Sequence, residues 1–536
     1  MYDLLVTGGR LLDGTGAPAR AADVAVHDGR VAAIGDLAGS PAGSTVDAAG
    51  RFVAPGFIDI HTHSDLTLLV EGRASSSVAQ GITTQVVGNC GVSAAPTRDY
   101  EPYYGPLDPA MTRGLDCDWT GFDGYFARLE DQGIGTNVAA LVGHGNVRVA
   151  AMGWDDREAT PAELARMRQL TARAMEDGAV GLSSGLAYAP GPYAPLDELV
   201  ALGQVIAPFG GIYTSHIRNQ TKGIAEAVAE VTAVAEGAGV AGHVSHMQPG
   251  SPMLGATAGL LADLDALRAR GVDVSCDAIP YTIGSTTLKS LLPPWALDGG
   301  DEALLRRLRD PEQRRAIQAD TLAHGAESGG SRKRNLAKEG AWDRIWLGSA
   351  GEANAYLTGL SFAEIGRTRG QDPHDAVLDI LVEEEARPWM LAEDVSEEDF
   401  LNIARHDAGG VISDGFSLIP EGVLAEGKHH PRSYGAFPYF LRRFIRDQGA
   451  LTWEQAVHKL TGHAAARFRL DGRGVLREGA WADLVVFDPE TVGETADFDD
   501  PYRYPRGIDH VYVNGVAAVS GGQLTDRRPG QVLRRC

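Results

Sequence analysis

Eight short apolar segments between residues 57 and 414 limit the fold of this chain more than any other feature. They cover residues 57–63, 83–90, 137–144, 179–186, 211–216, 241–246, 272–278 and 409–414. Apolar runs of this length, bounded by turn-forming residues, are typical of buried strands. Amphipathic helical patterns separate several of them, at residues 161–176, 221–236 and 259–270. Strands alternating with helices in this way predict an α/β fold, the (β/α)8 TIM barrel, whose chemistry lies at the carboxyl ends of the strands.

The two ends of the chain predict β structure instead. Short strands with Gly, Asp and Pro turns are expected at residues 3–7, 10–12, 23–27 and 30–34, and again at 482–487 and 509–513. We therefore expect a small β-sandwich built from residues 1–55 and 469–536, which flanks a barrel domain at residues 56–468. An insertion at about residues 285–345 follows the seventh strand. For it we favour a lid over the barrel mouth rather than a separate surface arm.

Composition narrows the classes of partner. The chain has 536 residues, of which 44% are hydrophobic, and a formal net charge of −23. An acidic surface repels phosphate groups, so binding to nucleic acids or anionic membranes is not expected. The sequence has no signal-peptide pattern, no apolar run reaches the roughly 18 residues that span a membrane, and four cysteines are too few for a disulfide framework. We expect a reduced cytoplasmic protein, a monomer or small homo-oligomer, that acts on a small molecule.

Six side chains that can bind metals fall at the ends of the expected strands: His61, His63, Cys90, His216, His246 and Asp414. His61 and His63 stand two residues apart, so on a strand both imidazoles leave the same face. Taken singly, a buried histidine often bonds a carbonyl, a buried cysteine is usually inert, and an Asp before Gly usually forms a turn. Six such residues at matching strand ends are hard to explain by chance. They predict a metal site at the barrel mouth, and imidazole and thiolate donors suit zinc.

Longer motifs resemble one family. The segment Gly-Phe-Ile-Asp-Ile-His-Thr-His at residues 56–63, the later single histidines, Asp414 and residues 474–488 are similar to the amidohydrolase superfamily. Many of its members bridge two metals with a carboxylated lysine from the fourth strand, but residues 179–186 contain no lysine. Cys90, in Gly-Asn-Cys-Gly at residues 88–91, instead resembles the N-acyl-D-amino-acid deacylases, or D-aminoacylases. Residues 184–188, 216–219, 280–281, 285–286 and 430–435 match the same family.

This resemblance implies a zinc-dependent hydrolase that cleaves the amide bond of N-acyl-D-amino acids or related N-acyl amino acids. Cys90, His216 and His246 would hold one zinc tightly. His61, His63 and Asp414 would form a second, weaker site, or one that is partly vacant. Asp414 would be the catalytic proton shuttle for attack by metal-bound hydroxide, and Arg432 would bind the substrate carboxylate in a two-pronged contact. The remaining candidates for substrate binding are Tyr188, Tyr281, Ser285 and Arg218.

The chain departs from this family at three positions that bear on recognition. Gln248 stands where these deacylases often carry a lysine that helps to hold the carboxylate, Gln220 replaces a frequent Glu, and Ile279 replaces a frequent Tyr. A D-peptide terminus, a β-amino-acid amide or another amide therefore stays open as the substrate. Two alternatives remain, a cyclic-amide hydrolase of the dihydropyrimidinase or hydantoinase kind and a metal-free scaffold that has lost catalysis. Cys90 and the missing lysine count against the first, and the six retained ligands count against the second.

Overall fold

Eight parallel strands form the centre of the molecule and confirm the predicted TIM barrel. The computed structural model describes residues 1–98 and 109–535. In sheet order the strands are β8 (Phe57–Asp59), β9 (Ile82–Val87), β10 (Asn137–Gly143), β11 (Gly181–Gly185), β12 (Ile212–His216), β13 (Ala241–Val244), β14 (Val274–Ala278) and β18 (Gly409–Val411). Each overlaps one of the eight apolar segments, and each pairs in parallel with the next.

The barrel closes through residues next to the candidate ligands. An isolated parallel bridge joins Thr62 to Gly415, beyond the regular ends of β8 and β18. The amide of Asp414 donates a hydrogen bond to the carbonyl of His61 at 3.0 Å, and the amide of His63 donates to that of Gly415 at 2.9 Å. These bonds fix the carboxyl rim of the barrel at the point where three of the candidate ligands emerge.

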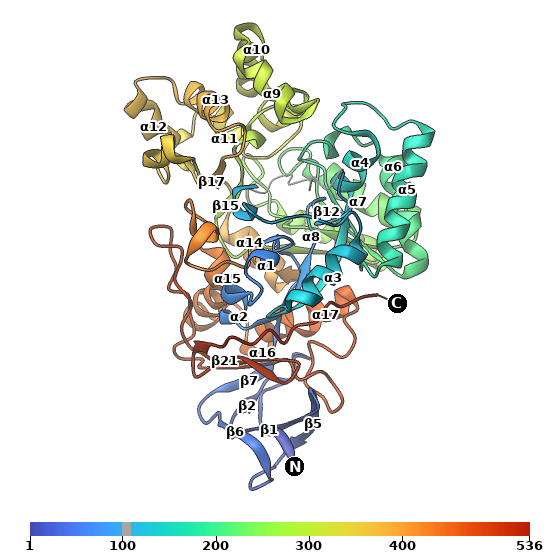
Figure 1. Ribbon diagram of the computed structural model, residues 1–536, viewed down its shortest axis with the longest axis vertical. Helices are drawn as coiled ribbons and strands as arrows, with labels where there is room; N and C mark the ends of the chain where they lie inside the picture. Colours follow the sequence, from blue (N-terminus) through green and yellow to red (C-terminus); the bar gives the residue numbers. More distant parts are fainter. Residues whose placement is uncertain (99–108, 536) are drawn as a thin grey trace.

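Helices cover the outside of the barrel (Figure 1). α5 (Pro161–Glu176) spans the predicted residues. The Thr160 side chain accepts a hydrogen bond from the Glu163 amide, and the Glu163 carboxylate accepts one from the Thr160 amide. This reciprocal cap satisfies amides that the first helical turn cannot bond itself. α7 (Ile224–Ala238) and α8 (Thr257–Ala269) also follow the predicted segments closely.

Both ends of the chain form β sheets at the bottom of Figure 1. One sheet has the order β5-β4-β1-β6, and the other has the order β22-β21-β20-β19-β7-β2-β3. Their strands are β1 (Tyr2–Thr7), β2 (Arg10–Leu11), β3 (Arg20–Ala21), β4 (Asp23–His27), β5 (Arg30–Gly35), β6 (Ala42–Asp47), β7 (Phe52–Pro55), β19 (Leu484–Phe487), β20 (Ile508–Val513), β21 (Val516–Ser520) and β22 (Gln523–Leu524). β7 pairs with β19, so the second sheet joins the two ends of the chain. Because Leu4, Val24 and Val486 share one buried cluster, we propose that residues 1–55 and 469–536 form a single β-sandwich domain. β3, β6, β7, β21 and β22 lie outside the strands expected from the sequence.

The insertion between β14 and β18 has a core of its own. Its sheet consists of β15 (Ile283–Thr287), β17 (Trp389–Glu393) and β16 (Ile345–Leu347), and its helices include α9 (Gly300–Arg309), α10 (Pro311–His324), α11 (Arg334–Lys338), α12 (Phe362–Arg369) and α13 (Pro373–Glu383). Its buried apolar side chains run from Leu288 to Ala392. We therefore propose an insertion that reaches from Ile283 to Glu393, longer than the predicted one. Figure 1 shows it at the top of the molecule, with the barrel between it and the terminal sheets.

Three of the four cysteines lie in the described part of the chain. Cys90, Cys117 and Cys276 are free thiols there, while Cys536 lies outside the described residues. Within residues 1–98 and 109–535, no helix has the length and apolar character needed to cross a membrane. Of these three thiols, Cys90 is the one that follows β9 at the barrel mouth.

Candidate metal centre

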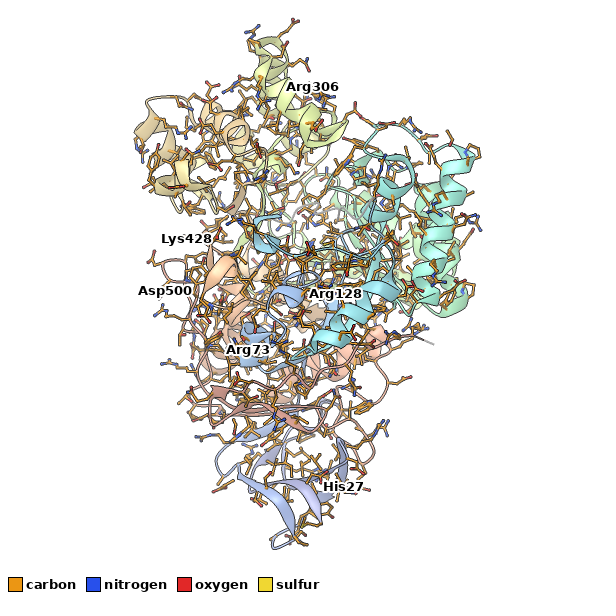
Figure 2. All side chains as sticks on the ribbon, viewed as in Figure 1. His27, Arg73, Arg128, Arg306, Lys428 and Asp500 are labelled. Carbon is orange, nitrogen blue, oxygen red and sulfur yellow. The ribbon has the colours of Figure 1, made fainter. Side chains whose placement is uncertain are left out.

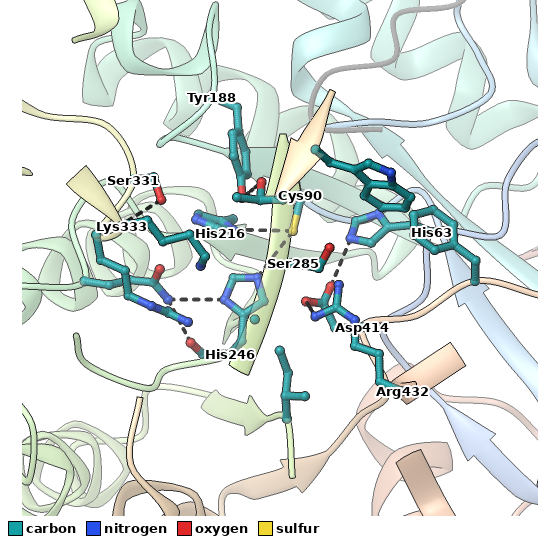
Figure 3. Close-up of a pocket in the computed structure, with 17 residues that line it drawn as sticks. His63, Cys90, Tyr188, His216, His246, Ser285, Ser331, Lys333, Asp414 and Arg432 are labelled. Atoms are coloured by element: carbon teal, nitrogen blue, oxygen red, sulfur yellow. Dashed lines mark hydrogen bonds and ion pairs between the residues drawn. The ribbon is translucent and has the colours of Figure 1, made fainter. Parts of the chain in front are cut away.

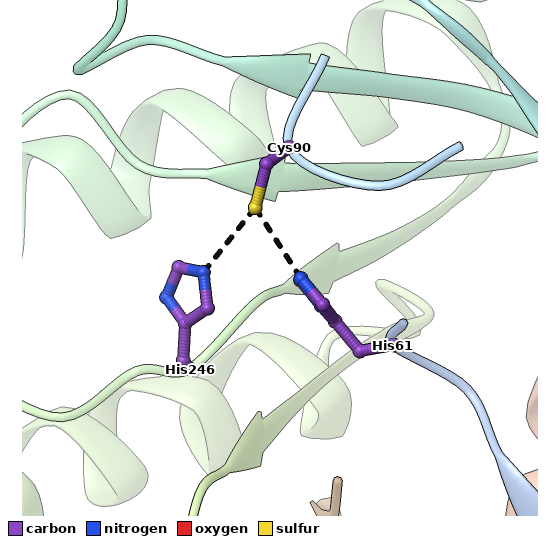
Figure 4. Close-up of side chains that lie close together, drawn as sticks. All are labelled: His61, Cys90 and His246. Carbon is purple, nitrogen blue, oxygen red and sulfur yellow. Dashed lines mark hydrogen bonds between the residues drawn. The ribbon is translucent and has the colours of Figure 1, made fainter. Parts of the chain in front are cut away.

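Three imidazoles approach one sulfur at the barrel mouth. Cys90 Sγ lies 3.3 Å from His61 Nε2 and 3.4 Å from His246 Nε2 (Figure 4). His216, the last residue of β12, places its Nδ1 3.7 Å from the same sulfur. These side chains come from four different strand ends and are all buried. Thiolate and imidazole donors that converge in this way match the chemistry of a protein zinc site.

The other candidate ligands form a second group that shares His61. His63 Nε2 lies 3.0 Å from Asp414 Oδ1, and His61 Nε2 lies 3.4 Å from the same oxygen. The ligand atoms of His61, Cys90 and His246 all lie within 4.8 Å of one another, as do those of His61, His63 and Asp414. The structure thus brings the predicted ligands together. It places His61 between the two groups, whereas the sequence analysis assigned it to the second group alone.

The backbone is left-handed at three of these ligands. Cys90, His246 and Asp414 have φ angles of 53°, 33° and 52°. This conformation is uncommon for residues other than glycine, and it typically costs about 1–3 kcal/mol unless the surroundings hold it in place. Only nine non-glycine residues in the described part of the chain adopt it, and three of them are these ligands. The rim of the barrel is therefore shaped to aim these side chains into one site.

The Gly-Asn-Cys-Gly motif sets the position of Cys90. Gly88 has a φ of 80°, and a Cβ atom there would lie 2.0 Å from the carbonyl oxygen of Leu141 on β10. No side chain fits in that space, so only glycine allows the end of β9 to pass so close to its neighbour. The Asn89 side chain donates a hydrogen bond to the carbonyl of Val86 at 2.9 Å, and this bond stabilises the turn that follows β9.

Two buried carboxylates behind the ligands were not predicted. Asp277 of β14 accepts hydrogen bonds from the His246 amide and, at 2.8 Å, from His243 Nε2. Its Oδ2 lies 3.8 Å from His61 Nδ1. Asp59 of β8 accepts a hydrogen bond from the His61 amide at 3.3 Å. Carboxylates in such positions orient the groups that bind a metal, and the only sequence signal for them is an acid inside a buried strand.

Electrostatics at the centre favour the metal-binding forms of Cys90, Asp414 and His216. For His61 and His63, by contrast, burial is outweighed by anionic neighbours, which raise the pKa of both, that of His63 to about 9. Burial raises the pKa of the Cys90 thiol, but the charges of its imidazole neighbours, His61 first, lower it well below its ordinary value. Burial also raises the pKa of Asp414, yet the Arg432 guanidinium lowers it well below its usual range. Burial lowers the pKa of His216 to about 4. A thiolate, a carboxylate and a neutral imidazole are the protonation states that zinc requires, so the residues fit this ion.

A cavity lies over the metal donors at the barrel mouth (Figure 3). The predicted residues that line it are His63, Cys90, Tyr188, His216, His246, Ser285, Asp414 and Arg432. Arg432 is buried, and its Nη1 lies 2.8 Å from Asp414 Oδ2. The Tyr188 hydroxyl accepts a hydrogen bond from Thr286 Oγ1 at 3.0 Å, and its ring centre lies 4.6 Å from that of His216. The structure therefore places the predicted carboxylate-binding arginine beside the predicted proton shuttle.

Two predicted substrate-binding residues lie outside this cavity. Tyr281 is stacked on Tyr439 with the ring centres 4.5 Å apart, and it does not line the cavity. Arg218 forms an ion pair with Glu230 at 2.8 Å and donates a hydrogen bond to the carbonyl of Pro192 at 2.7 Å. Arg218 is held by its ion pair and Tyr281 by ring stacking, and neither side chain lines the cavity. The family resemblance named them because a motif does not record where each side chain points.

The cavity also contains residues that the sequence analysis missed. Arg332 and Lys333, just before α11 in the insertion, line it together with Trp389 and Phe416. The signal was a run of three basic residues at 332–334 in a chain with a net charge of −23. A solvated surface segment explains such a run equally well, so only the folded insertion reveals that two of these side chains turn inward.

Comparisons with known proteins point to one family. The model of the family described as "Amidohydrolase family" matches residues 44–519. The chain is 38% identical to N-acyl-D-glutamate deacylase from Alcaligenes xylosoxydans xylosoxydans, with 99% of this chain and 96% of that protein covered. It is 36% identical to the N-acyl-D-glutamate deacylase of Bordetella bronchiseptica, solved with zinc and a phosphonate inhibitor that mimics the tetrahedral intermediate, with a TM-score of 0.83 over 99% of each chain. A solved D-aminoacylase with a binuclear metal centre gives a TM-score of 0.84 at 32% identity, with complete coverage of both chains.

Hydantoinases are more distant. L-hydantoinase from Arthrobacter aurescens is 18% identical to this chain and gives a TM-score of 0.54. A likeness at that level shows the barrel fold alone. The cyclic-amide alternative therefore has less support than linear amide hydrolysis.

Proposed function

The chain belongs to the amidohydrolase family, and on that premise we propose that it is a zinc-dependent hydrolase of the linear amide bond in N-acyl-D-amino acids or related N-acyl amino acids. The observation that carries the proposal is a buried arginine, Arg432, in the same cavity as the metal donors and next to Asp414. An N-acyl amino acid has a carboxylate close to its amide, and guanidinium is the side chain best suited to bind it. Hydantoin has no carboxylate that would need this arginine.

We propose one tight and one weaker zinc site. Cys90, His216 and His246 would hold the tight ion, because thiolate and imidazole are the donors that zinc prefers. His61, His63 and Asp414 would form the weaker site. This division is supported by the solved relatives, of which one contains zinc and another has a binuclear centre. The position of His61 near both Cys90 and Asp414 allows it to contribute to either site.

We assign proton transfer to Asp414. Zinc, when bound, activates a water molecule at neutral pH and polarises the amide carbonyl. Asp414 Oδ1 faces His63 and its Oδ2 faces Arg432, so the carboxylate lies between the metal donors and the expected substrate carboxylate. It accepts a proton from the attacking water and donates it to the amide nitrogen as the C–N bond breaks. Protonation makes the nitrogen a good leaving group and releases a free amino acid and a carboxylic acid.

Arg432 can serve Asp414 and a substrate at the same time. Its ion pair with Asp414 is formed through Nη1, which lies 2.8 Å from Oδ2. A guanidinium group has five N–H donors in a fixed plane, so the remaining donors can hold a second carboxylate. The ion pair also fixes the orientation of the guanidinium before substrate binds, which reduces the entropy that binding costs.

Replacement of Arg432 with Ala should selectively impair substrates that have a free carboxylate. We expect kcat/KM for an N-acyl amino acid to fall about 10- to 100-fold more than kcat/KM for its carboxamide, because a charge-assisted bond to a buried carboxylate is lost. The ratio of the two losses is the useful quantity, since the loss of the Asp414 partner can slow both substrates. Arg432→Lys should restore only part of the ratio, because ammonium cannot make the planar two-pronged contact.

Arg218→Ala is the matched control for Arg432→Ala. It removes the same charged group from a position that anchors a loop outside the cavity, so the ratio of acid to carboxamide should not change. If Arg432→Ala lowers kcat/KM equally for the acid and the carboxamide, Arg432 supports the loop and does not bind the substrate carboxylate.

The two alternative functions are tested by substrate type and by metal content. The proposed enzyme releases amine from N-acetyl-D-amino acids and leaves hydantoin and dihydropyrimidines intact. Ring opening of hydantoin without activity on N-acetyl-D-amino acids would reverse this assignment. A folded preparation with almost no bound metal and no amidase activity in added zinc would instead support a non-catalytic scaffold.

A further inference from the structure

A second positive centre in the cavity is not used by the proposed reaction. Arg332 and Lys333 are each 6% exposed, and both line the cavity. Arg332 Nε lies 2.7 Å from Asp394 Oδ2, and Lys333 Nζ lies 3.3 Å from the same oxygen. Asp394 directly follows β17 and is 2% exposed. Two buried cations of the insertion therefore share one carboxylate.

This cluster has one positive charge more than its carboxylate neutralises. The only other acceptor for the Arg332 side chain among the described residues is the neutral carbonyl of Gln248, at 3.1 Å. In the same part of the chain, Lys333 Nζ has no acceptor besides Asp394. Burial lowers the pKa of Lys333 to about 8 even though Asp394 lies beside it, as expected for a cation that is incompletely compensated. A buried charge without a partner is costly, so a ligand that supplies the missing negative charge would bind here.

The surrounding backbone makes room for both cations. A Cβ atom on Gly250 would lie 2.8 Å from Arg332 Cδ, and one on Gly284 would lie 3.2 Å from Lys333 Nζ. In the view of Figure 3, Lys333 and Arg432 enter the cavity from opposite sides, with His246 between them. A ligand that reaches both cations would extend across the metal centre.

We propose that Lys333 and Arg332 form a second carboxylate subsite and that the preferred substrate is an N-acyl amino acid with two carboxylates. One carboxylate binds Arg432, the other binds the pair from the insertion, and the amide lies at the metal donors. The second carboxylate comes from the side chain of an acidic amino acid or from a dicarboxylic acyl group, which present the same chemistry. The inference rests on the proposed function for the amide and for the first carboxylate.

Two pairs of substrates separate these sources. N-acetyl-D-glutamate is compared with N-acetyl-D-glutamine, and N-succinyl-D-alanine is compared with its succinamoyl analogue. The members of each pair have nearly the same shape and differ in one carboxylate. In at least one pair we expect kcat/KM for the dianion to exceed that for its amide by about 10- to 100-fold, the usual effect of a hydrogen bond to a charged group. The pair that shows the preference identifies the source of the second carboxylate.

Lys333→Met tests the subsite directly. The variant removes the ammonium and leaves Arg332 to hold Asp394, so the insertion keeps its buried ion pair. We expect the preference for the dianion to fall by at least about tenfold. Lys338→Met is the matched control, because Lys338 is on the adjacent helix α11 and pairs with Glu327 at 3.4 Å outside the cavity. Its preference should equal that of the unaltered protein.

Calorimetric binding of the products distinguishes failure of this inference from failure of the proposed function. D-glutamate is compared with D-glutamine, and succinate is compared with succinamate, for the unaltered protein and for Lys333→Met. Tighter binding of the product with two carboxylates supports the subsite if Lys333→Met abolishes the difference, even when no N-acyl-D-amino acid is hydrolysed. Equal turnover and equal binding within both pairs would overturn the subsite, although hydrolysis of N-acetyl-D-glutamine would still support the proposed function. The subsite would also be overturned if Lys333→Met lowered kcat/KM equally for both members of a pair. Lys333 would then act at the first carboxylate, which both members have.

Discussion

Cys90→Ala should leave the protein folded but with little bound zinc and almost no activity. Cys90 Sγ is the atom that three imidazoles approach within 3.3–3.7 Å, so its removal takes away the donor common to all of them. A zinc ion contributes several kcal/mol to the reaction, and its loss should reduce turnover about 10³-fold or more. His216→Ala and His246→Ala should act in the same direction. The measurements are zinc per chain after gel filtration and the initial rate of hydrolysis.

Cys276→Ala is the matched control for this prediction. Cys276 is also buried and free, but it lies in the middle of β14, where burial keeps its thiol protonated by raising its pKa. Removal of its sulfur should leave zinc content and turnover close to those of the unaltered protein. Full zinc content in Cys90→Ala would contradict the assignment of Cys90 as a ligand.

Asp414→Asn should retain the tightly bound zinc and reduce turnover about 10²- to 10⁴-fold, the usual effect of losing a general acid–base group. Asn keeps the shape of the side chain and a neutral oxygen, but it cannot accept the proton of the attacking water. The left-handed backbone at position 414 suits this variant, because Asn adopts that conformation more readily than most residues. Zinc content, kcat and KM should be measured on the same preparation.

Asp407→Asn removes an exposed carboxylate at the opposite end of β18 and provides the control. It should not change zinc content or turnover. Near-normal kcat in Asp414→Asn would show that another group transfers the proton. Loss of the tightly bound zinc in Asp414→Asn would show that Asp414 acts first as a ligand.

Local sequence patterns predicted the barrel and the convergence of its six candidate ligands. Parallel strands of a barrel all end at the same mouth, so topology alone brings together ligands that stand at the ends of different strands. His61 and Asp414 illustrate the point, because they are more than 350 positions apart in the sequence and yet bond through the closing strands, with the Asp414 amide 3.0 Å from the His61 carbonyl. The order of the strands alone therefore predicts that these two residues lie side by side.

Residues that depend on side-chain direction or on the folded insertion could not be predicted in the same way. Lys333 lines the cavity beside barrel residues because the folded insertion places it there, next to the buried Asp394. Arg218 and Tyr281 belong to motifs near the mouth, but their side chains turn to protein partners. The β-sandwich is also held together by the pairing of β7 with β19. These strands are far apart in the sequence, so neither segment by itself indicates that they pair.

We expect the zinc-loaded protein to release free amino acid from N-acyl-D-amino acids. The most direct measurement is the initial rate of amine release from matched N-acetyl-D- and N-acetyl-L-amino acids, acidic and neutral, with zinc per chain determined on the same sample before and after chelation. We expect release that depends on zinc, is faster for the D enantiomer and returns when zinc is added back. Release that persists unchanged after zinc is removed, or no release from any D substrate by protein with its full zinc content, would contradict the account.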